Sequence, residues 1–70
     1  MKKENVPIQV AAELLGISDL SVRGLLINKP GAIGYAWKNE KSDCYKYHIS
    51  PYLLGKYVGM KKSDIYKLYE

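Results

Sequence analysis

The side chains best suited to covalent or metal chemistry in this sequence are its single cysteine, Cys44, and its single histidine, His48. A thiol and an imidazole can form a nucleophile–base pair or share a metal ion. They stand four positions apart in a stretch that reads as an extended strand, which separates them by about 13 Å. That separation is too long for a hydrogen bond or a shared ligand. With no second histidine and no glycine-rich phosphate loop, we expect no catalysis, no cofactor and no metal site.

The other candidate chemistry is the recognition of anions. Arg23 is the only arginine, and its guanidinium can grip a guanine edge or a phosphate through two hydrogen bonds. Eleven Lys and Arg residues against seven Asp and Glu residues give a net charge of +4, which favours a polyanionic partner. The plainer interpretation of Arg23 is a solvated side chain, or one paired with Asp19 four residues earlier.

Length and composition limit the class of protein. Seventy residues form one domain, too small for the deep pocket that most enzymes need, and 47% hydrophobic residues predict a folded chain. The single cysteine excludes an internal disulfide and suits a reducing cytoplasm. The charged start, residues 1–5, leads into no long apolar run, so we expect neither a signal peptide nor a membrane association.

Two helices and a tight turn must position Arg23. The first is predicted from Pro7 to Leu15 and ends at Gly16, which accepts a left-handed conformation. The second has Ser18 as its N-cap and ends at residues 28–31. Its expected apolar stripe is Val22, Leu25 and Leu26, and its expected outer face is Asp19, Ser21, Arg23 and Gly24. A glycine inside a helix costs about 1 kcal/mol relative to alanine, which suggests that the backbone at Gly24 closely approaches DNA or the first helix.

A β-hairpin and a further helix are predicted next. Segments 33–38 and 44–49 alternate in side-chain size and flank a polar turn at 39–43. The residues expected to share one face of each strand are Ile33, Tyr35 and Trp37 on the first and Tyr45, Tyr47 and Ile49 on the second. We expect most tyrosines and Trp37 to build the core of this phenylalanine-free chain; the alternative for them, most open for Trp37, is a platform that stacks single-stranded bases.

The C-terminal part is predicted to be helical. Ser50 and Pro51 open a helix that carries Leu53, Leu54 and Tyr57 inward and ends at Gly59. Residues 60–70 form a tail, in which Ser63 and Asp64 are candidate caps of a short helix carrying Ile65, Leu68 and Tyr69.

The helix pair meets the requirements of a helix-turn-helix. Two helices that cross through a tight turn need small residues at the crossing, a glycine in the turn and branched apolar residues on the second helix. The chain supplies these in register with Ala12, Gly16, Ile17, Val22 and Leu25. The order helix, turn, helix, hairpin, helix then predicts an α+β, mostly α fold: a winged helix-turn-helix domain over residues 1–59, with the two-stranded hairpin as wing and a C-terminal helix.

Two stretches carry a family resemblance. Ala11–Ser18 followed by Ser21–Arg23 resembles the start of the small MerR-like winged-helix family, which includes phage and transposon excisionases and small prophage DNA-binding proteins. Tyr45–Pro51, leading into Leu53 and Leu54, resembles the wing and final helix of such proteins, so that the resemblance spans residues 6 to 59.

The resemblance implies a binding mode for double-stranded DNA. The second helix of the family lies in the major groove, and its wing follows the neighbouring backbone or minor groove. Carried over by position, the DNA-contacting residues are Ser18, Ser21, Arg23, Asn28, Lys29, Lys38, Lys41 and Lys46. This chain departs from the family in having Asp19, which repels phosphate, and a single basic residue in the body of the helix, so we expect weak binding at a single site.

We therefore expect a bacterial or phage cytoplasmic DNA-binding protein and not an enzyme. An excisionase-like architectural factor acting with a recombinase or integrase, or with further copies of itself, is the first interpretation. A prophage transcriptional regulator is the second, and a packaging or replication accessory protein is the third. The alternative from another class is a protein–protein interaction module that uses the same helix-turn-helix surface, with Asp19 and Leu20 exposed.

Overall fold

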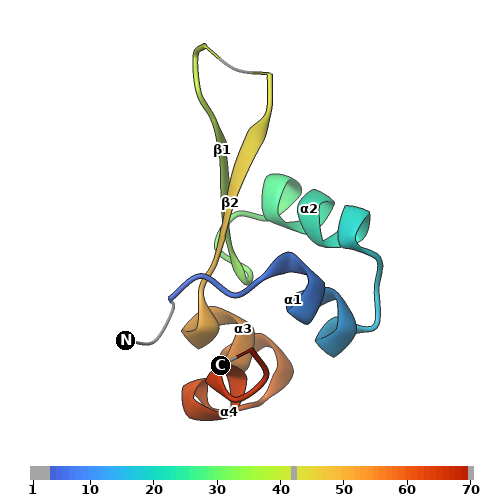
Figure 1. The fold of residues 1–70 in the computed structure, drawn as a ribbon, viewed down its shortest axis with the longest axis vertical. Helices are drawn as coiled ribbons and strands as arrows, with labels where there is room; N and C mark the ends of the chain where they lie inside the picture. Colours follow the sequence, from blue (N-terminus) through green and yellow to red (C-terminus); the bar gives the residue numbers. More distant parts are fainter. Residues whose placement is uncertain (1–3, 42, 70) are drawn as a thin grey trace.

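The computed structural model describes residues 4–41 and 43–69, and it shows a small α+β fold that is about half helical (Figure 1). Four helices and a two-stranded antiparallel hairpin follow one another as α1 (Ile8–Leu15), α2 (Asp19–Asn28), β1 (Gly34–Lys38), β2 (Tyr45–Ile49), α3 (Pro51–Val58) and α4 (Lys62–Tyr66). The hairpin extends from one end of the molecule, α2 lies beside its base, and α3 and α4 lie at the opposite end (Figure 1). Residue 42 of the predicted turn, and residues 1–3 of the charged start, lie outside the described residues.

The C-terminal end of α1 and the N-terminal end of α2 follow local chemistry, as predicted, whereas α1 begins at Ile8 with Pro7 as its N-cap and not as its first residue. Gly16 ends α1 with a left-handed φ of +70°, and the next amide, that of Ile17, donates to the carbonyl of Ala12 at 3.1 Å. The hydroxyl of Ser18 accepts a hydrogen bond from the Ser21 amide at 3.1 Å and so caps α2. The turn between α1 and α2 is therefore stabilised by local hydrogen bonds on both sides.

A small aliphatic core holds the elements together. Val22 and Leu26 of α2 are buried against Ala11 and Ala12 of α1 in one cluster. Leu25, predicted in the same stripe, is only partly buried and packs at the edge of this cluster. The other buried hydrophobic residues of the cluster are Val6, Ile33, Ile49, Leu54 and Ile65.

The hairpin has one face toward this core and one face away from it. Residues opposite each other in an antiparallel pair share a face, and the register pairs Ala36 with Tyr47 and Trp37 with Lys46. Ala36 and Tyr47 pack against the core, whereas Tyr35 and Trp37 are exposed. Ile33, predicted to share one face of the first strand with Tyr35 and Trp37, precedes the strand and is fully buried, whereas the other two are exposed.

The prediction that most aromatic residues build the core is also wrong. Of the seven tyrosines, only Tyr66 is buried, and Tyr47 and Tyr69 are partly buried. The exposed aromatic residues are Tyr35, Trp37, Tyr45, Tyr52 and Tyr57. Tyr57 was expected to pack inward with Leu54, but it is 56% exposed. The core is instead formed by small and aliphatic side chains from several elements.

The last two helices pack into the same core. Ser50 caps α3 by accepting from the amide of Leu53 at 3.3 Å, and Gly59 ends the helix in the left-handed conformation, both as predicted. A short helix does occur within residues 60–70, but its N-cap is Lys61 and not Ser63, which lies inside α4. Ile65 of α4 is fully buried, so the packed unit extends through this helix.

The lengths of the helices bear on membrane insertion. Within residues 4–41 and 43–69, no helix combines the length and the apolar character that crossing a bilayer would require.

Candidate nucleic-acid interface

The exposed side of α2 carries the N-terminal group of predicted contact residues. Ser18, Ser21 and Arg23 are all exposed, whereas the intervening Val22 is fully buried and anchors the opposite side of the helix. Successive residues of an α-helix point in different directions, so Val22 faces the core while Ser21 and Arg23 do not. The arginine side chain is therefore turned outward.

Arg23 is held by an aromatic ring of the hairpin. Its guanidinium carbon lies 6.0 Å from the centre of the Tyr47 ring, a cation–π arrangement that joins α2 to β2. The ring of Tyr45 lies 6.3 Å from that of Tyr47, tilted by 30°. No ion pair connects Arg23 with Asp19, although the structure describes both residues. The side chain is therefore supported from the hairpin and remains accessible.

The two serines at the start of α2 form a compact donor site. Ser18 donates its hydroxyl hydrogen to the Ser21 hydroxyl oxygen at 2.9 Å while accepting from the Ser21 amide. A hydroxyl has one hydrogen and two lone pairs, so Ser21 keeps its own hydrogen for an external acceptor. At a helix N-terminus such a donor suits an anionic oxygen.

The predicted lysines of the hairpin do not lie on one surface. Lys38 pairs with Tyr45 in the register and shares the face of Tyr47 and Arg23, whereas Lys46 pairs with Trp37 on the other face. The ammonium of Lys38 lies 3.9 Å from Asp43 in an exposed ion pair. Exposed ion pairs of this kind contribute about 0–1 kcal/mol to protein stability, so the two side chains separate readily. Lys38 is therefore available on the same side as Arg23, and Lys46 is not.

The remaining predicted residues lie at two ends of this surface. Lys41 is exposed in the hairpin turn. Asn28 and Lys29 are exposed at the C-terminal end of α2, opposite its serine end.

Gly24 shows no tight packing, since an added Cβ would meet only the Asn28 amide nitrogen at 4.0 Å. The interpretation that Gly24 permits close approach of the first helix is therefore wrong, and close approach of DNA stays a prediction.

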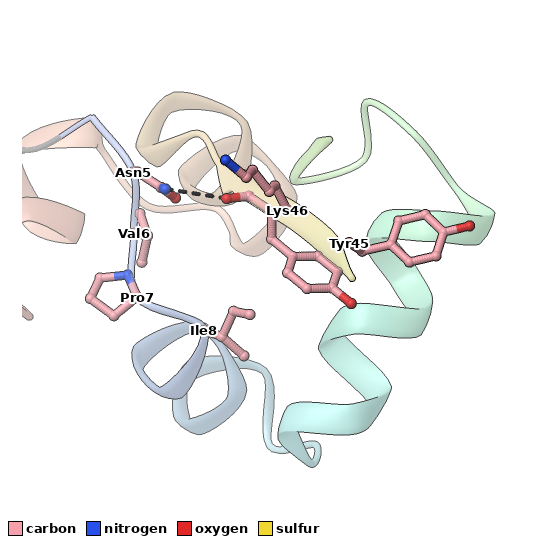
Figure 2. Close-up of a pocket in the computed structure, with 7 residues that line it drawn as sticks. Asn5, Val6, Pro7, Ile8, Tyr45 and Lys46 are labelled. Atoms are coloured by element: carbon pink, nitrogen blue, oxygen red, sulfur yellow. Dashed lines mark hydrogen bonds between the residues drawn. The ribbon is translucent and has the colours of Figure 1, made fainter. Parts of the chain in front are cut away.

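A hollow of about 440 Å³ lies between the N-terminal segment and β2 (Figure 2). Its lining residues are Asn5, Val6, Pro7, Ile8, Tyr45, Lys46 and Tyr47. The side chain of Asn5 donates to the carbonyl of Tyr47 at 3.2 Å and accepts from the amide of Ile49 at 2.9 Å. In Figure 2 the Lys46 side chain and the Tyr45 ring point in different directions, as their opposite faces require. Asn5 thus closes part of the outer edge of β2 and stabilises the strand that carries Tyr47.

Neither the pairing of Asn5 with β2 nor the contact of Tyr47 with Arg23 was predicted from the sequence. A lone asparagine before a helix has no periodic signal, and its pairing with β2 spans 44 positions of the chain. Tyr47 stood in an alternating segment, but its contact with Arg23 depends on how α2 crosses the hairpin.

The groups whose pKa values are displaced lie outside this surface. The hydrogen bond from Tyr66 lowers the pKa of Glu4, with a further contribution from nearby Lys62. Burial raises the pKa of Tyr66, and the hydrogen bond with Tyr66 raises that of Lys62. This cluster joins the N-terminal segment to α4 and contains none of the predicted contact residues.

Comparison with known proteins gives no match. No protein-family model matches this chain, and neither the curated proteins nor the solved structures contain a significant match to it.

Proposed function

We propose that this protein binds double-stranded DNA as a small winged helix-turn-helix domain, with α2 in the major groove and the hairpin along the adjacent backbone. The observation that supports the proposal is the exposed side chain of Arg23. The adjacent Val22 buries this part of α2 in the core, and the Tyr47 ring contacts the guanidinium. A supported arginine loses less conformational freedom when it forms two hydrogen bonds to a base or a phosphate.

The dimensions of α2 are compatible with this mode. An α-helix with its side chains is about 10–12 Å across, and the major groove is about 12 Å wide, so α2 can enter it along its length of about 15 Å. Ser21 and Arg23 then face the groove from the first half of the helix. Asn28 and Lys29 face the flanking backbone from its end.

The hairpin supplies the sequence-independent part of the binding. Lys38 and Lys41 extend beyond α2 toward the hairpin turn, where a phosphate can replace the weak partner of Lys38, Asp43. Each lysine that neutralises a phosphate releases counterions, so binding weakens as salt rises. Lys46 faces away and is not assigned to this surface.

The biological setting proposed here rests on the resemblance of residues 6 to 59 to small MerR-like proteins. In that setting the protein acts in the bacterial host cytoplasm as an excisionase-like architectural factor or a transcriptional regulator of a phage or mobile element. Because Arg23 is the single basic side chain in the body of α2 and Asp19 repels phosphate, one copy binds weakly. Further copies on DNA, or a recombinase, then supply the remaining affinity.

Duplex binding followed by fluorescence anisotropy across a salt series tests the proposal. We expect Arg23→Ala to weaken binding at least about fivefold, the effect of losing about 1 kcal/mol of polar contact. Lys67→Ala removes the same charge from an exposed position just after α4 and is the matched control, which should bind as the unmodified protein does. Equal weakening by both variants, or binding that does not change with salt, would contradict the proposal.

A second candidate is supported by the exposed apolar residues at the start of α2. Leu20 is 75% exposed and Ile17 is 39% exposed, beside the acidic Asp19. A protein–protein interaction module would use such a surface. In that case no duplex binds even at low salt, and Leu20→Ser, rather than Arg23→Ala, abolishes binding of the protein partner.

A further inference from the structure

We propose that the outward face of the hairpin is a second nucleic-acid site, one that takes the unpaired bases of a single strand. This outer hairpin face consists of Tyr35, Trp37, Lys46 and His48, which the register places in two directly opposed pairs. It is distinct from the surface assigned to duplex DNA, which lies on the side of Arg23 and Tyr47.

The two rings of this face lie outside the hydrophobic core. Tyr35 is 53% exposed and Trp37 is 47% exposed, and neither belongs to the core cluster. The opposite face packs against the core through Ala36 and Tyr47. Large rings left in water on a short strand offer apolar surface that a planar partner can cover.

The spacing of the two rings favours separated bases over a duplex. Tyr35 and Trp37 are alternate residues of β1, so their Cα atoms are about 7 Å apart along the strand and their side chains leave the same face at that interval. Bases stacked in a duplex strand rise by about 3.4 Å each. Two rings at twice that interval match bases that have been spread apart, each stacking on one ring. Aromatic stacking of this kind accepts any base.

Charge on this face suits a phosphate backbone. Lys46 lies opposite Trp37 and His48 lies opposite Tyr35, so a hydrogen-bonding or cationic group accompanies each ring. None of the four residues is acidic, and the acidic residues of the hairpin, Glu40 and Asp43, lie in the turn. The Glu4 carboxylate interacts electrostatically with His48, but it is already paired with Lys62 and Tyr66. A strand that stacks its bases on the rings can place a phosphate beside the ammonium of Lys46.

A second copy of the protein is a poorer occupant for this face. About half of each ring is exposed, and aromatic side chains of ~150–250 Å² then offer on the order of 200 Å² together. Stable protein interfaces bury about 800 Å² on each partner. A stretch of one or two nucleotides fits the available area much better.

Trp37 is the only tryptophan, so its fluorescence reports directly on this face. The test titrates the full chain with oligothymidylate and oligouridylate of about 12 nucleotides, following both tryptophan emission and the anisotropy of the labelled strand. We expect saturable quenching, and Trp37→Ala should weaken single-strand binding at least about fivefold, the loss of one stacked base. Trp37→Phe keeps a ring and should retain most of the binding. Tyr52→Ala removes an exposed aromatic ring on α3, away from the hairpin, and is the matched control.

The two sites can fail separately. Arg23→Ala should leave single-strand binding intact, and Trp37→Ala should leave duplex binding intact, with circular dichroism confirming that each variant is folded. Single strands that leave the emission unchanged, or Trp37→Ala binding them as the unmodified protein does, would overturn the site. So would sedimentation showing self-association that disappears in Trp37→Ala, because the face would then belong to a second copy.

Discussion

At the scale of single residues, two glycines inside helices have opposite surroundings. In α2, a Cβ added to Gly24 would have only the Asn28 amide nitrogen nearby, at 4.0 Å. In α3, a Cβ added to Gly55 would lie 2.6 Å from the carbonyl oxygen of Met60, a backbone atom that cannot easily move. There is therefore room for a side chain at Gly24 in α2 but not at Gly55 in α3.

These surroundings predict opposite effects of the same substitution. Gly24→Ala should raise the free energy of unfolding by about 0.5–1 kcal/mol, because alanine loses less backbone entropy in a helix. Gly55→Ala should lower it by about 1–3 kcal/mol, because the methyl group forces α3 away from the following turn. Urea unfolding measures both. A destabilised Gly24→Ala protein would contradict the open surroundings of Gly24 on α2.

At the scale of elements, local chemistry accounts for what could be predicted. A glycine that accepts positive φ and a serine that caps the next amide act within four residues, so the turn from α1 to α2 was predictable. The same holds for Ser50 and Gly59 at the two ends of α3. The alternation of the two strand segments likewise predicted a hairpin.

The burial of the hairpin's side chains could not be predicted in the same way. Alternation shows that two faces exist, but not which one another element covers. The exposure of Trp37 and the contact of Tyr47 with Arg23 follow from the position of α2 beside the hairpin. The division of Lys38 and Lys46 between two faces depends on the strand register. The support of Arg23 by Tyr47 and the positions of the hairpin lysines thus depend on how the elements pack together, which the local sequence does not determine.

At the scale of the whole molecule, the N-terminal segment holds the two ends of the fold together. Asn5 pairs with β2, and the adjacent Glu4 accepts a hydrogen bond from the hydroxyl of Tyr66 at 2.6 Å. The ammonium of Lys62 lies 3.3 Å from the same carboxylate. The hydrogen bond of Glu4 with Tyr66 spans 62 positions of the chain and those of Asn5 span 42 and 44, so no local pattern in the sequence predicts them.

This carboxylate predicts a specific pH dependence of stability. The hydrogen bond from Tyr66, with help from Lys62, holds the pKa of Glu4 below its ordinary value of 4.5. The unfolded chain therefore takes up this proton at a higher pH than the folded chain, and the stabilisation is lost as pH falls below about 4.5.

Thermal or urea unfolding between about pH 7 and about pH 3 checks this expectation. Glu4→Gln should lower stability at neutral pH and flatten the decline on acidification. Tyr66→Phe should act in the same direction, and the double variant should add little to either change, because both remove one interaction. An unchanged decline in Glu4→Gln would mean that the carboxylate is not engaged in solution.

The most direct test of the DNA-binding account is a map of the amide resonances that move when a short duplex is added to the isotopically labelled chain. If duplex DNA binds as proposed, the largest shifts occur in α2 around Ser21 and Arg23 and in the hairpin near Lys38, with α3 and α4 almost unchanged. Shifts confined to α3 and α4, or none at low salt and a large excess of duplex, would contradict it.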